Sequence, residues 1–221
     1  MRAILFGSVP LRSKQIQALK KRVRILESDL KIGVDGGFQL GRRFGVEPDF
    51  FVGDQDSIPI RIRRDVIAEN SLVLSTEKDR SDLYYATLSA LMAGATRLTY
   101  IAVTGGPRMD HHMATMLDLV QVAQGRFGKV KSIEAHGPEG SYYFLSDEMP
   151  AWRAKLSLGQ LVSVFAMTPR VTGVHLQGFK FPLKNSTLEP HSLGLSNQVR
   201  CRRCEIRIKK GVLLVVVPSL E

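Results

Sequence analysis

Four short polar motifs carry the residues that could do chemistry, and each follows a short apolar run. They are Asp35-Gly36-Gly37, Gly53-Asp54-Gln55-Asp56-Ser57, Lys78-Asp79-Arg80-Ser81-Asp82 and Thr104-Gly105-Gly106-Pro107-Arg108-Met109-Asp110-His111. Carboxylates are common to all four, and lysine or arginine accompanies them in the last two. Carboxylate oxygens bind hard divalent cations, and cationic side chains bind phosphate groups. These residue types together predict a Mg²⁺-dependent phosphate site.

The pair Asp54 and Asp56 gives the metal signal of this set. On extended backbone both side chains project to the same side, and two such charges about 4 Å apart repel by about 4 kcal/mol at an effective dielectric of about 20. A cation between them removes this repulsion. Mg²⁺ fits because it is commonly bound by one or two carboxylates plus substrate phosphates. Taken alone, the motif is explained equally well by a solvated acidic turn.

The third motif opens a predicted helix, because apolar residues between 83 and 92 follow a helical period. A helix N-terminus presents free N–H groups, which Asp79 or Ser81 can cap and which can also bind phosphate. Asp82 can reach a metal from the same turn. Capping explains Asp79 and Ser81 but does not explain why Lys78 stands beside them.

The fourth motif is a predicted turn between a strand and a helix. Arg108 can hold a phosphate in bidentate fashion, and Asp110 can orient a hydroxyl or take its proton. His111 and His112 are expected to cap or pack rather than to bind metal. In the first motif, the glycines of residues 35–37 allow a sharp turn and a close approach to a ligand, although a purely structural turn explains them equally well. The chain has neither a P-loop nor the dinucleotide G-x-G-x-x-G motif.

The elements that must position these motifs change in texture near residue 138. Before it, apolar runs alternate with helix-period segments, which predicts an α/β fold: a mostly parallel sheet with helices on both faces. After it, strand-like runs recur between turn formers, which predicts a smaller all-β sandwich. We therefore expect a catalytic domain over 1–138 and a sandwich over 139–221. Open parallel sheets bind ligands at the carboxyl ends of their strands, so the polar motifs should converge.

Composition narrows the class of protein. The 221 residues are 44% apolar and 24% charged, as in globular proteins, and no run approaches the roughly 20 apolar residues of a membrane span. The absence of a signal-like segment and the presence of only two cysteines, Cys201 and Cys204, indicate a reducing, cytoplasmic setting. The net charge is +10, and cations gather at 200–210. A nucleic-acid surface there is disfavoured, because no aromatic residues interleave to stack bases.

In their order and spacing these motifs resemble the thiamine pyrophosphokinase family. The resemblance rests on Asp35–Gly37, Pro48–Ser57, Lys78–Asp82, Arg108–His111 and Leu193–Asn197. It implies an α/β catalytic domain followed by a β-sandwich, and a homodimer with the active site between subunits. The activity it implies is transfer of the β,γ-pyrophosphoryl group of ATP to the hydroxyethyl group of thiamine, giving thiamine diphosphate and AMP.

The resemblance also implies roles for individual residues. It implies Mg²⁺ ligands at Asp54, Asp56 and Asp82, and a role near the transferring group for Asp110. The ATP contacts expected from the resemblance and from the motif at the helix start are Lys78, Asp79, Ser81 and Arg108. The expected thiamine contacts are Asp35, Ser196 and Asn197.

Two positions depart from the family pattern. Pro107 replaces a glycine of the phosphate turn and removes a backbone donor, and the sole tryptophan, Trp152, precedes the Ser196-Asn197 pair. Two alternatives to the thiamine reaction stay open. One is a Mg²⁺-dependent nucleotide pyrophosphotransferase or hydrolase with another acceptor, and the other is a basic nucleic-acid-binding module.

Overall fold

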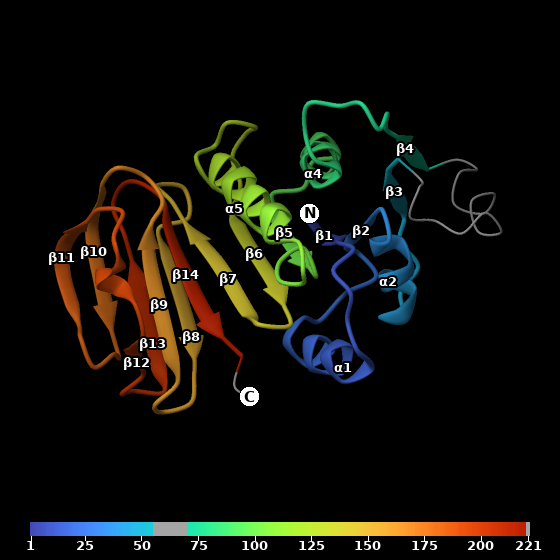
Figure 1. Ribbon diagram of the computed structural model, residues 1–221. Helices are drawn as coiled ribbons and strands as arrows, with labels where there is room; N and C mark the ends of the chain where they lie inside the picture. Colours follow the sequence, from blue (N-terminus) through green and yellow to red (C-terminus); the bar gives the residue numbers. More distant parts are fainter. Residues whose placement is uncertain (55–69, 220–221) are drawn as a thin grey trace. The chain divides into compact units, whose positions relative to one another are not determined.

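A computed structural model describes residues 1–54 and 70–219, which form two compact units (Figure 1). The first unit comprises Met1–Asp118 and Ala135–Pro138, and the second comprises Leu119–Glu134 and Glu139–Glu221. Asp56, a predicted metal ligand, lies outside the described residues. Every helix in the described part of the chain is too short or too polar to cross a membrane.

A mostly parallel sheet runs through the first unit. Its strands are β1 (Arg2–Phe6), β2 (Leu30–Val34), β3 (Phe50–Gly53), β4 (Ser71–Val73), β5 (Arg97–Ile101) and β6 (Ser132–Gly137). The order is β6-β5-β1-β2-β3-β4, and β1 pairs in parallel with both β2 and β5. The chain builds outward from β1 on one side and returns to its other side with β5. This reversal opens a crevice beyond the carboxyl ends of β1 and β5, where open α/β sheets bind ligands.

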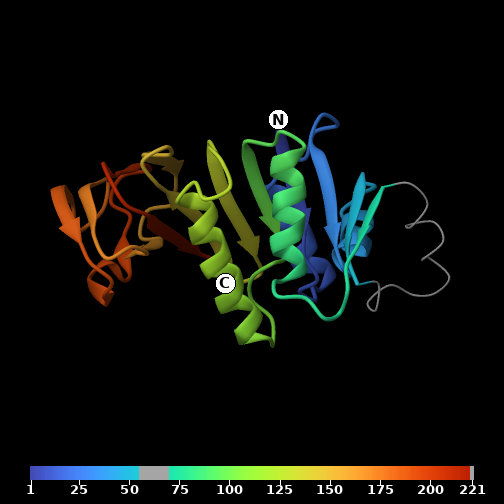
Figure 2. The ribbon, with the colours of Figure 1, turned by 90° about the horizontal axis from the view of Figure 1, so that it is seen from above.

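Helices cover both faces of this sheet. They are α1 (Ser13–Arg22), α2 (Gly37–Arg43), α4 (Asp82–Met92) and α5 (Met109–Ala123). Phe6 of β1 packs in one core cluster with Leu19 of α1 and Leu40 of α2. Tyr100 of β5 points to the opposite face, where its hydroxyl lies 3.0 Å from the hydroxyl of Thr87 in α4 (Figure 2). The predicted arrangement of helices around a parallel sheet is confirmed.

The second unit contains two antiparallel sheets. Their strands are β7 (Gly140–Leu145), β8 (Ala151–Lys155), β9 (Leu161–Ala166), β10 (Val171–Gln177), β11 (Leu183–Leu188), β12 (Asn197–Gln198), β13 (Arg203–Arg207) and β14 (Leu213–Pro218). The orders are β12-β9-β14-β7 and β11-β10-β13-β8. One buried cluster joins Val164 and Val215 of the first sheet to Val174 and Ile206 of the second. The predicted β-sandwich is therefore confirmed.

The two glycines that follow Asp35 differ in what they require. Gly37 opens α2 and lies so close to β1 that an added Cβ would stand 1.8 Å from the carbonyl oxygen of Phe6. Around Gly36 there is more room, since the nearest atom to an added Cβ is Cβ of Ser8 at 3.4 Å. The close approach that the sequence predicted at this motif is therefore made by Gly37 to a neighbouring strand.

We expect Gly37→Ala to lower the free energy of unfolding by about 3 kcal/mol, because the new methyl group overlaps backbone that cannot move aside. The matched variant Gly36→Ala, on backbone with φ of −56°, should change it by less than about 1 kcal/mol. Urea denaturation of both variants measures the difference. Equal stability of the two variants would contradict this account of α2 packing.

Candidate active site

A cleft of about 510 Å³ lies at the carboxyl ends of β1, β2 and β5 in the first unit. Its walls include Asp35 after β2, Ser81 and Asp82 at the start of α4, and Arg108 after β5. These residues come from three of the four polar motifs. Their convergence agrees with the expectation that parallel strands bring their carboxyl ends to one edge.

Lys78 links two carboxylates at this site. Its Nζ lies 3.0 Å from Oδ1 of Asp82 and 3.9 Å from Oδ2 of Asp54, and it also donates to the carbonyl of Ser75. The three charged side chains are only 14–22% exposed. Burial opposes the charge on Lys78, but the Asp82 and Asp54 carboxylates outweigh it and raise the pKa of the ammonium. Lys78 is thus held as a cation between strand β3 and helix α4.

Asp35 is the most perturbed carboxylate of the site. Burial, followed by the nearby charges of Asp82 and Asp54, raises the pKa of Asp35 to about 7. Its backbone adopts φ of 49°, a left-handed conformation that aspartate tolerates better than most residues. Gly53 makes room for the carboxylate, since a Cβ there would stand 2.0 Å from Oδ1 of Asp35.

The donors of this cleft fit a divalent cation. The buried Oδ1 atoms of Asp35 and Asp82 accept no hydrogen bond, although Lys78 forms an ion pair with Asp82. Three carboxylates face one ammonium, so positive charge is deficient, and hard cations prefer such oxygen donors. Within residues 1–54 and 70–219, no three His, Cys, Asp or Glu side chains are spaced to hold one ion. The predicted ligand Asp56 is outside these ranges.

The turn after β5 places Arg108 at the cleft and Asp110 outside its walls. Arg108 donates to both carboxylate oxygens of Asp110, at 2.9 and 2.6 Å, and this pairing holds the pKa of Asp110 well below its usual range. Both side chains are more than 60% exposed, so solvent screens the pair. His112 accepts a hydrogen bond at Nδ1 from the N–H of Gly105, and it caps the turn as predicted.

Ser81 is the N-cap of α4. Its Oγ accepts from the N–H of Tyr84 and donates to Oδ2 of Asp118, both at 3.1 Å. Asp118 lies in α5, and sequence reasoning missed it; burial raises its pKa. Its one sequence signal is an acidic residue between Leu117 and Leu119. Asp79, a predicted ATP contact, is exposed and does not line the cleft.

The predicted thiamine contacts Ser196 and Asn197 lie in the second unit. Asn197 is buried, and its amide group exchanges two hydrogen bonds with the backbone of Phe181, at 3.0 and 2.8 Å. Ser196 is exposed, has φ of 56°, and donates its N–H to Oγ of Ser163. Asn197 thus holds the local backbone, whereas the Ser196 side chain is accessible.

We expect Asp35→Asn to stabilise the metal-free protein more at about pH 8 than at about pH 5. A carboxyl group with a folded pKa near 7 and an unfolded pKa of 3.8 lowers stability progressively as pH rises between those values, and asparagine does not titrate. After allowance for solvent screening, the gain should grow by roughly 1–2 kcal/mol across this range. Urea denaturation in EDTA measures it, and a gain independent of pH would contradict the raised pKa.

Two descriptions of one family match the chain: "Thiamin pyrophosphokinase, catalytic domain" over residues 23–130, and "Thiamin pyrophosphokinase, vitamin B1 binding domain" over residues 152–213. No curated protein matches in sequence.

Solved structures share the fold over almost the whole chain. A thiamine pyrophosphokinase from Bacillus subtilis superposes with a TM-score of 0.81 at 22% identity, covering 100% of both chains. One from Geobacillus thermodenitrificans gives 0.77 at 21% identity, covering 100% of this chain and 99% of the other. One from Candida albicans gives 0.70 at 11%, covering 99% and 89%. Because the two family descriptions together match most of its length, the chain belongs to the thiamin pyrophosphokinase family of enzymes.

Proposed function

We propose that the chain transfers the β,γ-pyrophosphoryl group of ATP to the hydroxyethyl group of thiamine and releases AMP. One observation carries the proposal: the side chains of Asp35, Asp54, Asp82 and Lys78 meet at the same cleft that Arg108 lines. Transfer of phosphoryl-type groups is catalysed mainly by positioning and by neutralisation of charge. A cleft with fixed carboxylates for a metal and with cations for phosphates supplies both.

Mg²⁺ is the cofactor in this proposal, with Asp54, Asp56 and Asp82 as its ligands. The buried Oδ1 of Asp82, which accepts no hydrogen bond, supports this assignment. Bound there, Mg²⁺ would neutralise charge on the phosphates of ATP and on the leaving AMP. Lys78 would then exchange part of its carboxylate pairing for contacts with phosphate oxygens.

The remaining groups of the cleft act on the substrates themselves. The N–H groups at the start of α4, the Ser81 side chain and Asp79 are the contacts that we assign to ATP, together with Arg108. When Arg108 turns to phosphate, it releases the carboxylate of Asp110, which can then accept the proton of the thiamine hydroxyl. Asp35 offers its carboxylate to thiamine, which is a cation.

The second unit supplies the other thiamine contacts in this proposal, with Ser196 presented by backbone that Asn197 holds. We propose a homodimer in which these contacts complete the site of the partner. Exposed apolar side chains in the same region support an interface: Phe181, Leu193 and Leu195 are 57–73% exposed. The free thiols of Cys201 and Cys204 support a reducing location, the cytoplasm.

Asp82→Asn should lower kcat/KM by at least about 100-fold while leaving the thermal unfolding midpoint within a few degrees, because it removes charge that the metal needs. Glu77→Gln, a neighbouring loss of one negative charge outside the cleft, should leave the rate nearly unchanged. Production of AMP and thiamine diphosphate from ATP, Mg²⁺ and thiamine is the measurement. AMP without thiamine diphosphate would indicate another acceptor or water, and no AMP from the parent protein would reject the proposal.

Arg108→Ala should raise KM for ATP by at least about tenfold, because a bidentate phosphate contact is lost. The thiamine KM should change much less. Steady-state kinetics with each substrate varied in turn measures both constants. A larger effect on thiamine than on ATP would move Arg108 to the acceptor side of the reaction.

A further inference from the structure

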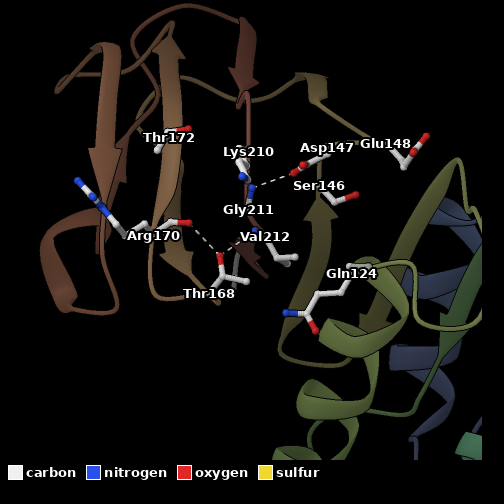
Figure 3. Close-up of a pocket in the computed structure, with 11 residues that line it drawn as sticks. Gln124, Ser146, Asp147, Glu148, Thr168, Arg170, Thr172, Lys210, Gly211 and Val212 are labelled. Atoms are coloured by element: carbon white, nitrogen blue, oxygen red, sulfur yellow. Dashed lines mark hydrogen bonds between the residues drawn. The ribbon is translucent and has the colours of Figure 1, made fainter.

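A cavity of about 600 Å³ lies wholly within the second unit. Three turns form it, between β7 and β8, between β9 and β10, and between β13 and β14, and Gln124 closes one side (Figure 3). None of its lining residues belongs to the motifs that the proposed reaction uses. Its size falls within the roughly 300–1,000 Å³ of sites that bind small molecules.

Hydrogen bonds between the turns hold the cavity in shape. The N–H of Gly211 donates to Oδ1 of Asp147 at 2.8 Å, which ties the third turn to the first. The N–H of Val212 donates to Oγ1 of Thr168 at 3.1 Å, and the same hydroxyl donates to the carbonyl of Arg170 (Figure 3). The site is therefore formed before any ligand arrives.

Ser146 provides an unused polar group in the wall of this cavity. The residue is 3% exposed, and its Oγ has no hydrogen-bond partner. A buried hydroxyl without a partner destabilises a folded chain by roughly 1–3 kcal/mol. Because Ser146 lines the cavity, a ligand there can supply the missing partner.

The charges around the cavity leave a cation without an anion. Glu148 pairs with Lys129 at 3.0 Å, and Asp147 accepts the Gly211 N–H, so both acids have partners. Lys210 has no ion-pair partner among residues 1–54 and 70–219. Arg170 reaches only Glu189, at 3.9 Å, and its guanidinium points away from Ser146 in Figure 3. The cavity is thus complementary to an anion.

We propose that this cavity is a second binding site, for a small anion whose phosphate or carboxylate group contacts Lys210 and Ser146. The site does not depend on the proposed reaction, because it shares no residue with the catalytic cleft. Its framework of turns is rigid, and its two unsatisfied donors are a hydroxyl and an ammonium. These donors match the oxygens of one anionic group.

Calorimetric titration of the full chain in EDTA with inorganic pyrophosphate, and separately with citrate, tests the site. Ser146→Ala and Lys210→Gln should each weaken the dissociation constant of the bound probe by at least about tenfold. Lys209→Gln makes the same change of charge one residue away, outside the cavity wall, and should leave binding unchanged. Binding of pyrophosphate alone would assign phosphate ligands, and binding of citrate alone would assign carboxylates.

Ser146→Ala should also leave the melting temperature unchanged or raise it, because the hydroxyl that it removes has no partner in the protein. A fall in melting temperature would show that the hydroxyl is structural and would overturn its role in binding. Absence of saturable binding by both probes, or equal weakening by Lys209→Gln, would reject the site.

Discussion

The first unit depends on one electrostatic constraint, which is that three carboxylates share an edge of the sheet with one ammonium. Asp82 and Asp54 pair with Lys78, whereas burial and these same carboxylates bring the pKa of Asp35 to about 7. Such a group of like charges lowers the stability of the fold. Binding of a cation relieves the repulsion, so the free energy that the fold loses here is recovered when the site is occupied.

Local backbone features make this crowding possible. Asp35 adopts a left-handed conformation, and Gly53 beside it has no Cβ to block the carboxylate. Ala102, at the end of β5, also has a positive φ of 57° and lines the same cleft. Unusual conformations of this kind are found at functional sites because the surrounding structure holds them in place. Here β1, β2 and β5 provide that support.

The two hollows of the molecule have opposite electrostatic needs. The chain carries a net charge of +10, yet the cleft in the first unit is short of positive charge. The cavity in the second unit has paired acids and the unpaired ammonium of Lys210. Net charge therefore says little about which ligand either hollow takes. The pairing of individual side chains decides it, because solvent screens the exposed charges that dominate the total.

The sequence by itself determined the alternation of strands and helices and the place of each polar motif at a strand end, because periodicity and turn residues are local properties. The convergence of Asp35, Asp82 and Arg108 followed from the geometry of parallel sheets. Only the tertiary structure decided that Ser81 contacts Asp118 and that three distant turns enclose Ser146. These contacts depend on distances between segments that lie far apart in the chain, and no local pattern encodes such distances.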